Sequence, residues 1–244
     1  MQNTKSETTG QKHISTLAED IKSLISGISE GKSLNMTDEN MDVFLKNIKE
    51  AMLAWNTPRV RPDKEGQLRM SSIGKPSRQL WYDKHSPKDR KDEDAGMNLK
   101  FLYGHIIEHL VLYLAELAGH KVEDQQRKIE VEGVSGHIDS IIDGEICDVK
   151  SASSFSFKKF KSGEIVGDDP FGYHAQLAGY EAGCGTKEGG FLVVDKSNGD
   201  ICFYKPDDMA KPNVKQLITD LRVSLEQDTP PEKCYPFKEE KNGN

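Results

Sequence analysis

Two aspartates and a lysine lie on the two strands of a predicted β-hairpin, at spacings that suit a divalent cation. The Asp-Gly pair at 143–144 separates two short apolar runs, which is a strong signal for a two-residue hairpin turn. Counting outward from this turn places Asp139 opposite Asp148. Because side chains alternate along a strand, Lys150 lies on the face of Asp148, with His137 opposite it. The pattern therefore predicts two neighbouring carboxylates with a lysine beside them.

The pair of Asp139 and Asp148 has two interpretations. Like charges directly across a ladder destabilise a sheet, so a divalent cation between the carboxylates would explain why the hairpin carries both. Hard carboxylate oxygens suit Mg²⁺ or Mn²⁺. Alternatively, both side chains point to solvent from the open face of a sheet and Lys150 neutralises them. The hairpin alone leaves both interpretations open.

The composition is ordinary for a soluble protein with a sizeable core. The chain has 244 residues, of which 35% are hydrophobic and 30% are charged. Residues 1–10 contain no apolar signal-peptide core, and no stretch approaches the length of a membrane span. We therefore expect a cytoplasmic protein without a membrane partner. The four cysteines have no C-x-x-C spacing, which argues against a disulfide framework or a structural zinc site.

The charges are distributed unevenly along the chain. The net charge of −7 argues at first against nucleic acid, because neutralising phosphates requires Lys and Arg. However, residues 59–91 contain ten basic and four acidic side chains, and a second basic cluster follows at Lys158, Lys159 and Lys161. Such runs are most often solvated loops. A basic lining for a phosphate backbone is the alternative.

The hydrophobic periodicity predicts two N-terminal helices followed by a mixed α/β core. The helices run over 13–30 and from the N-cap Thr37 to about Trp55, and we expect residues 1–57 to form a tail and a helical appendage. Residues 58–244 then form the main domain. Its expected elements are a helix at 99–118, strands at 128–132, 134–142 and 145–151, a helix at 171–182, strands at 189–195 and 200–205, and a helix after Pro212. This order predicts an α/β (α+β) fold with a central mixed sheet flanked by helices.

Two of the predicted helices place polar residues on one face. Gly104 and Glu108 are four residues apart, and the glycine would let another backbone or a ligand approach the carboxylate. Gln176 and Tyr180 have the same spacing on the helix at 171–182. A helical Glu is usually exposed and a helical Tyr usually lies in a core. A Gln in this setting can also bind a phosphate or a base.

Taken in order, these residues resemble the metal-dependent PD-(D/E)xK nuclease superfamily. The segments that carry the resemblance are Gly104-x-x-x-Glu108, Gly136-x-x-Asp139, Asp148-x-Lys150 and Gln176-x-x-x-Tyr180. The last segment is similar to the signature of the branch with RecB-type nuclease domains, CRISPR adaptation nucleases and lambda-type phage exonucleases. The motifs cover roughly residues 70–205. The resemblance implies a restriction-endonuclease-like core.

The resemblance also implies roles for the acidic residues. Glu108, Asp139 and Asp148, with the Val149 carbonyl, would bind one or two Mg²⁺ ions, and Mn²⁺ would substitute. Lys150 would help to position the attacking water. Two positions depart from the common pattern, since Asp148 stands where Glu is more frequent and Glu108 stands where many RecB-like members have His. The Glu form favours the lambda-type exonucleases.

A segment before the first acidic motif, at residues 71–82, also resembles the family. Within it, Ser72 and Arg78 are predicted to contact phosphate, because Arg is suited to bidentate phosphate recognition. Gln176 and Tyr180 are predicted to contact the DNA together with them.

We predict no iron–sulfur cluster. In related nucleases that carry a cluster, one cysteine lies in this segment and three more lie near the C-terminus. Here Lys75 and Pro76 occupy the first place, and Cys234 has no cysteine close to it.

These observations together predict a magnesium-dependent DNA exonuclease. We expect it to degrade one strand of duplex DNA from an end, in the 5′ to 3′ direction of the lambda-type enzymes, in phage recombination or replication in the host cytoplasm. Expected partners are duplex ends, a single-strand annealing or binding protein, and further copies of the chain in a homo-oligomer. One alternative is an endonuclease of the same fold, of the restriction or junction-resolving type. A non-cutting DNA-end-binding protein is the other.

Overall fold

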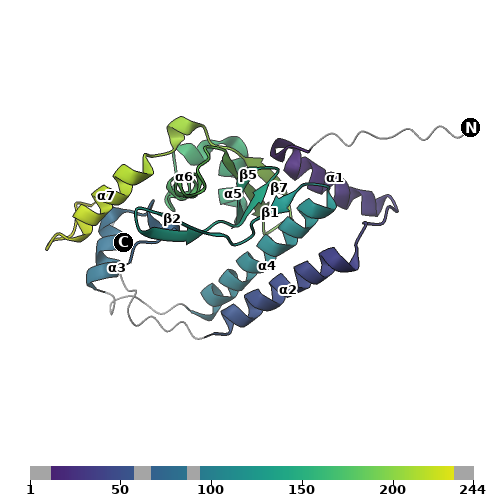
Figure 1. Ribbon diagram of the computed structural model, residues 1–244, viewed down its shortest axis with the longest axis horizontal. Helices are drawn as coiled ribbons and strands as arrows, with labels where there is room; N and C mark the ends of the chain where they lie inside the picture. Colours follow the sequence, from purple (N-terminus) through teal and green to yellow (C-terminus); the bar gives the residue numbers. More distant parts are fainter. Residues whose placement is uncertain (1–11, 58–66, 87–93, 234–244) are drawn as a thin grey trace, which may run out of the picture.

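The computed structural model describes residues 12–57, 67–86 and 94–233 (Figure 1). The helices are η1 Ile14–Thr16, α1 Leu17–Ser29, α2 Asp38–Trp55, η2 Met70–Ser72, α3 Ser77–His85, α4 Ala95–Leu117, α5 Ser154–Ser162, η4 Glu164–Val166, α6 Tyr173–Cys184, η5 Asp208–Ala210 and α7 Val214–Leu225. The strands are β1 Val122–Glu123, β2 Lys128–Val131, β3 Val134–His137, β4 Ser140–Ile142, β5 Glu145–Ala152, β6 Gly189–Asp195 and β7 Ile201–Tyr204.

A five-stranded sheet in the order β1-β4-β5-β6-β7 forms the centre of the protein. Strands β5 and β6 are parallel, and the other neighbours are antiparallel. Helices α5 and α6 connect the two parallel strands, which is the crossover that a parallel pair requires. Strands β2 and β3 pair with each other in a separate two-stranded sheet. The predicted mixed sheet flanked by helices is therefore confirmed.

Helices cover both faces of the central sheet, because apolar residues alternate along β6. Phe191 and Val193 belong to a core that includes residues of α5, α6 and α7. Leu192 and Val194 face the other way and pack in a second core with residues of α1 and α4. Along β5, Ile146 lies in the first core and Cys147 in the second. Period-two alternation therefore places Asp148 and Lys150 on the face covered by α6.

The N-terminal helices pack against the rest of the protein. Ile14, Leu17 and Ile21 are buried in the second core, against the sheet. Helix α2 lies along α4 (Figure 1), and the rings of Phe44 and Tyr113 stack between these helices with centroids 4.8 Å apart. The sequence expectation of an appendage therefore understates how α1 contributes to the core, while the domain division at residue 57 stays a prediction.

The predicted hairpin has the expected register, but its first strand is interrupted. Ile142 pairs with Glu145 and Ile141 with Ile146, and the ladder ends at the pair Ser140 and Cys147. The strand predicted over 134–142 divides into β3 and β4, because residues 134–137 pair with β2 instead of β5. His137 consequently lies opposite Lys128, and the prediction that it lies opposite Lys150 is wrong.

Local signals explain several other element boundaries. Thr37 caps α2 as predicted, since its side chain accepts a hydrogen bond from the Asn40 amide. Helix α4 begins earlier than predicted because the Asp94 side chain caps it by accepting from the Met97 amide at 2.7 Å. Helix α5 and strand β1 were not predicted. The basic residues at 158–161 therefore lie on a helix.

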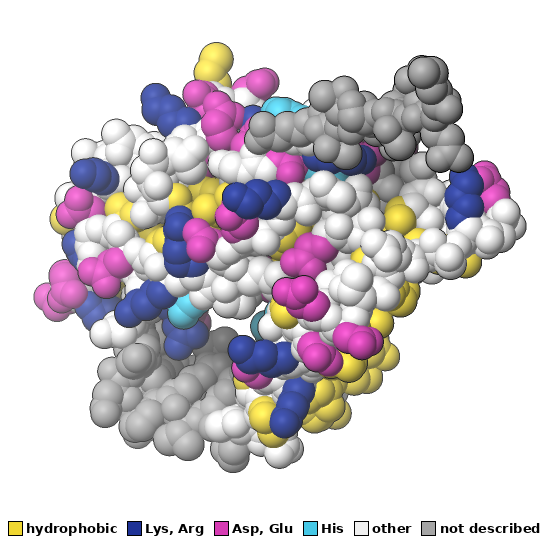
Figure 2. All heavy atoms as spheres, turned by 45° about the vertical axis from the view of Figure 1, so that its right-hand side comes forward, with side chains coloured by type: hydrophobic (Ala, Val, Ile, Leu, Met, Phe, Trp, Pro, Cys, Tyr) yellow, Lys and Arg dark blue, Asp and Glu magenta, His cyan; other side chains and the backbone are white. Residues whose placement is uncertain are grey.

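Charged side chains of both signs are mixed over the face shown in Figure 2, with hydrophobic side chains gathered along one edge and a hollow near the centre. Lys159 forms an ion pair with Asp168, and Lys161 forms one with Asp200 at 2.8 Å. These two lysines of the predicted basic lining are thus already paired with carboxylates. None of the described helices is long and apolar enough to cross a membrane.

Candidate active site

Asp139 and Asp148 lie next to each other where the hairpin ladder ends. Asp148 is in β5 and only 1% of its surface is exposed. Asp139 immediately precedes β4, and its Oδ2 accepts a hydrogen bond of 2.7 Å from the backbone amide of Val149. The Asp139 carboxylate is therefore fastened to the strand that carries Asp148 and Lys150. The predicted neighbourhood of the two aspartates is present, although no ladder pair joins them.

Lys150 is held by contacts on several sides. Its Nζ lies 2.5 Å from Asp148 Oδ2 and donates to Gln176 Oε1 at 3.2 Å. The same ammonium lies over the Tyr173 ring, 5.0 Å from the centroid. Gln176 is oriented in turn, because its Nε2 donates to the Tyr180 hydroxyl at 2.7 Å. Helix α6 thus fixes the position of the lysine on β5.

The structure gives the Gln-x-x-x-Tyr pair a role that the sequence prediction did not include. Gln176 and Tyr180 are both buried, and Gln176 joins the two other side chains by accepting from Lys150 and donating to the Tyr180 hydroxyl. Gly136 allows this arrangement, because a Cβ there would lie 2.5 Å from Met70 Cβ and 3.2 Å from the Tyr180 ring. The direct DNA contacts predicted for Gln176 and Tyr180 stay predictions.

Glu108 approaches from helix α4 and is also buried, with 8% of its surface exposed. Its Oε1 accepts a hydrogen bond of 2.6 Å from Gln126 Nε2, and its Oε2 lies 3.8 Å from His105 Nδ1. Gln126 was not singled out in the sequence, because no local spacing connects it to Glu108. No described backbone approaches Gly104 closely, since a Cβ there would meet only Ser151 Oγ at an ordinary 3.8 Å, and the predicted approach of a ligand stays a prediction.

The electrostatics identify Glu108, Asp139 and Asp148 as one group. Burial raises the pKa of Asp139 well above its usual range, and the charges of Asp148 and Glu108 raise it further. Burial also raises the pKa of Asp148, against the opposing effect of Lys150, and Glu108 adds to the rise. Burial disfavours the charged form of Lys150, but Asp148 and Asp139 more than offset this, so its pKa is raised. Bringing three carboxylates together with one ammonium therefore favours the uptake of a proton or of a cation at this site.

The donor set fits a hard divalent cation by its chemistry. Carboxylate oxygens are the ligands that Mg²⁺ and Mn²⁺ prefer. The Lys150 ammonium, 2.5 Å from the buried Asp148 Oδ2, occupies the place beside this carboxylate where such a cation would also be attracted. Within the described residues, no three His, Cys, Asp or Glu side chains stand close enough together to hold a metal ion. Each carboxylate is instead turned to its own neighbour: Glu108 to Gln126, Asp139 to Val149, and Asp148 to Lys150.

The two side chains predicted to contact phosphate have protein partners. The Ser72 hydroxyl donates to the Arg69 carbonyl and accepts from the Arg69 amide at 3.2 Å. Arg78 donates to the Pro231 carbonyl at 2.6 Å and to the Tyr82 hydroxyl at 3.1 Å, so it ties α3 to the segment after α7. Their phosphate contacts stay predictions.

The cysteines of the described residues are not gathered. Cys147 and Cys202 are buried in the sheet and Cys184 ends α6 as a free thiol, while Cys234 lies outside the described residues. The prediction of no iron–sulfur cluster is not tested by these positions.

Comparison with solved structures found nucleases. The alkaline exonuclease LHK-Exo from Laribacter hongkongensis has a TM-score of 0.42 and 15% identity, over 73% of this chain and 94% of that one. LHK-Exo in complex with dAMP has a TM-score of 0.43 and 16% identity, over 67% and 89%. A phage-related exonuclease from Haemophilus somnus 129PT has a TM-score of 0.42 and 15% identity, over 72% and 91%. No protein-family model and no curated protein matches the chain. At these identities and TM-scores, the function has to be argued from the side chains themselves.

Proposed function

We propose that the chain is a divalent-metal-dependent deoxyribonuclease that hydrolyses phosphodiester bonds at DNA ends. The observation that carries this proposal is the constellation of two buried carboxylates, Glu108 and Asp148, with the half-buried Asp139 and Lys150, in which Lys150 Nζ lies 2.5 Å from Asp148. Carboxylates whose pKa values are raised by burial and by neighbouring carboxylates are costly for a fold unless a cation or a reaction uses them. Carboxylates with such unfavourable free energies are found mainly at functional sites.

The residues divide the work of phosphodiester hydrolysis among three elements. Glu108 on α4, Asp139 before β4, and Asp148 with the Val149 carbonyl on β5 would hold Mg²⁺ or Mn²⁺. A bound ion supplies charge stabilisation for the nonbridging phosphate oxygens and lowers the pKa of a bound water. Lys150 has three N–H donors, of which the contacts with Asp148 and Gln176 use two, and the third would orient the attacking water against the phosphorus. Gln176 keeps this ammonium in place through its 3.2 Å bond.

We further propose Mg²⁺ as the metal and exonucleolytic attack on one strand of duplex DNA, in the 5′ to 3′ direction. The support is the Glu at position 108, because a Glu at this place in the motif is typical of the lambda-type phage exonucleases. We accordingly propose a role in phage recombination or replication in the host cytoplasm. An endonuclease of the same fold predicts cleavage of covalently closed DNA, and a non-cutting end-binding protein predicts binding without cleavage.

Duplex DNA with different labels on its 5′ and 3′ ends tests these proposals together. We expect the wild type to remove label progressively from one end in Mg²⁺ and to be inactive with chelator. Asp148→Asn should be inactive in both conditions. Asp42→Asn, an exposed carboxylate on α2, is the matched control and should behave as the wild type. Cleavage of closed circular DNA would support the endonuclease, and undiminished cleavage by Asp148→Asn would overturn the site.

A further inference from the structure

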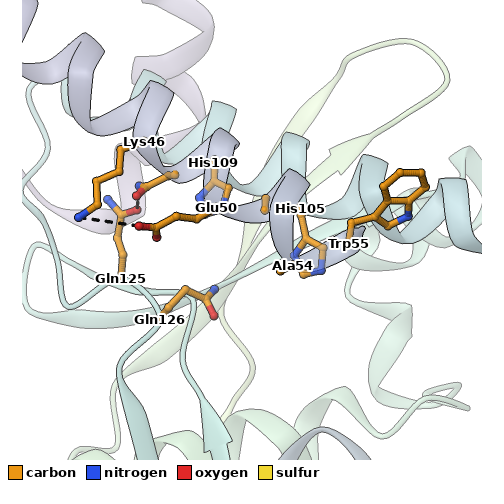
Figure 3. Close-up of a pocket in the computed structure, with 10 residues that line it drawn as sticks. Lys46, Glu50, Ala54, Trp55, His105, His109, Gln125 and Gln126 are labelled. Atoms are coloured by element: carbon orange, nitrogen blue, oxygen red, sulfur yellow. Dashed lines mark hydrogen bonds and ion pairs between the residues drawn. The ribbon is translucent and has the colours of Figure 1, made fainter. Parts of the chain in front are cut away.

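A pocket of about 570 Å³ lies between α2 and α4, beside the carboxylate site. Figure 3 shows its α2 wall facing His105 and His109 of α4, with Gln125 and Gln126 across from both helices. The lining residues are Lys46, Asn47, Glu50, Ala51, Ala54, Trp55, His105, His109, Gln125 and Gln126. This volume is within the range of small-ligand sites. The mechanism described above uses none of the α2 residues.

The pocket shares a wall with the candidate active site. Gln126 lines the pocket and donates to Glu108 Oε1 at 2.6 Å. His105 also lines it, and its Nδ1 lies 3.8 Å from Glu108 Oε2. A group bound in this pocket is therefore one side chain away from a carboxylate that would hold the metal. The occupant that this position of the pocket favours is another part of the substrate that is cleaved at the carboxylates.

The pocket contains the groups that recognise a nucleobase. Trp55 is 41% exposed, and its Nε1 donates to the Asn98 carbonyl at 3.1 Å, which fixes the orientation of the indole. Asn47 donates to Gln125 Oε1 at 3.0 Å, which leaves both N–H groups of the Gln125 amide as donors. Among the described residues, no hydrogen-bond partner reaches the buried His109 Nδ1. Figure 3 shows Trp55 at one end of the lining and Gln125 at the other, with His105 and His109 between them. The exposed aromatic face suits stacking of an unpaired base, and the polar groups extend from it along the pocket.

The charges of the pocket argue against a phosphate as the occupant. Lys46 Nζ and Glu50 Oε1 are 4.0 Å apart across one turn of α2, so the ammonium is already matched by a carboxylate. A phosphate requires unmatched donors with positive charge. A base is neutral and offers both donors and acceptors, so it suits this lining.

We propose that the pocket between α2 and α4 binds an unpaired nucleobase at the end of the DNA substrate, with Trp55 as the stacking surface. This inference rests on the proposed nuclease function, because it places the base beside the site that cleaves its strand. It gives α2 a role in substrate recognition. The protein would hold a duplex end by binding the terminal nucleotide whose base is no longer paired.

The test uses the full chain with Asp148→Asn, which retains the pocket and cannot cleave. The probes are duplex DNA with a short single-stranded overhang that ends in fluorescent 2-aminopurine, and the same DNA with an abasic terminal nucleotide. We expect Trp55→Ala to weaken binding of the base-bearing DNA roughly tenfold, the size of one stacking contact. Its affinity for the abasic DNA should equal that of the parent. Trp55→Phe should retain most of the binding because it keeps an aromatic face.

The control is Leu53→Ala, which removes an exposed side chain of α2 outside the pocket lining and should bind as the parent does. Equal effects of Trp55→Ala on the two DNAs, or no effect on either, would overturn the pocket assignment. Wild-type cleavage of labelled DNA is measured in parallel. If cleavage is intact and base dependence is missing, only the pocket proposal fails. If base-dependent binding is present and cleavage is missing, only the proposed function fails.

Discussion

The Gln176 side chain accepts a hydrogen bond from Lys150 Nζ at 3.2 Å, and this contact joins α6 to the candidate active site on β5. A hydrogen bond to a charged group contributes roughly 1.5–3 kcal/mol. We therefore expect Gln176→Ala to lower kcat for DNA cleavage about tenfold to a hundredfold. KM should change little, because the lost contact orients Lys150 and does not bind substrate. Steady-state kinetics on end-labelled duplex DNA measures both constants.

Two further variants separate a positioning role for Gln176 from a DNA contact. Tyr180→Phe removes the hydroxyl that accepts from Gln176 Nε2 and should lower kcat in the same direction by a smaller factor. Tyr103→Phe removes an exposed hydroxyl of α4 and should leave both constants unchanged. A higher KM with an unchanged kcat in Gln176→Ala would show instead that this side chain contacts the DNA.

The carboxylate cluster should cost stability when no cation is present. Burial and the charges of Asp148 and Glu108 oppose ionisation of Asp139. Asp139→Asn removes one charge, and the Asn side-chain oxygen can still accept from the Val149 amide. In chelator we expect Tm to rise by about 3 °C, the shift that about 1 kcal/mol produces in a domain of this size. Mg²⁺ should raise the Tm of the wild type and have little effect on the variant.

Scanning calorimetry with and without Mg²⁺ distinguishes this outcome from a purely structural role. If Asp139 serves only to anchor β4 to β5, Asp139→Asn would leave Tm unchanged or lower it in chelator, and both proteins would respond equally to the metal. Asp42→Asn again serves as the control, because its carboxylate is exposed on α2.

Local spacing predicted the parts of the site that lie close together in the sequence. The Asp-Gly turn fixed the register from Ile142 to Ser140, and this register brings Asp139 next to the strand of Asp148. Helical spacing placed Gln176 and Tyr180 within hydrogen-bond reach of each other. In these cases the period of a helix or a strand determines the relative position of the side chains.

Contacts between distant segments could not be predicted in the same way. Gln126 reaches Glu108 because the turn before β2 meets α4, and no pattern in either segment indicates this meeting. The interruption of the predicted strand at 134–142 depends on which neighbour each half pairs with, since β3 pairs with β2 and β4 with β5. Helix α5 begins after a capping Ser153 and ends at Gly163, and both residues are helix-boundary signals that the sequence contains.

A buried histidine fastens α1 to the hairpin turn. His120 Nδ1 lies 2.6 Å from Asp143 Oδ2, and its Nε2 lies 3.2 Å from Asp20 Oδ2. Removing the imidazole leaves both carboxylates without this hydrogen-bond partner, and a buried polar group left unsatisfied typically costs roughly 1–3 kcal/mol, or more when it is charged. We expect His120→Ala to lose about 3 kcal/mol of unfolding free energy in urea titrations. Lys121→Ala removes an exposed ion pair with Glu123 and should cost less than about 1 kcal/mol.

If His120→Ala and Lys121→Ala destabilise the protein equally, the histidine contacts are not a structural tie. The urea m-value decides whether only stability has changed, because a lower m-value in His120→Ala would show that α1 detaches before the rest unfolds.

Asp169 organises the start of α6 and should make stability depend on pH. Its carboxylate accepts from the Tyr173 and His174 amides at 2.9 Å each, and its Oδ2 also lies 2.9 Å from His174 Nδ1. Burial alone would raise the pKa of Asp169, but these hydrogen bonds outweigh it and lower the pKa. A carboxylate with a lowered pKa in the folded state stabilises the protein above its unfolded pKa.

We therefore expect the wild type to be more stable than Asp169→Asn by about 1 kcal/mol at neutral pH, because the variant keeps an acceptor oxygen but loses the charge that strengthens its hydrogen bonds. The difference should shrink below about pH 4, because the unfolded carboxylate has a pKa of about 3.9 and the folded one takes up its proton at lower pH. Urea titrations of both proteins from neutral pH down to about pH 3 measure the difference, with Asp42→Asn as the control. A difference that stays constant with pH would show that the charge of Asp169 does not stabilise α6, the helix that holds Gln176 against Lys150.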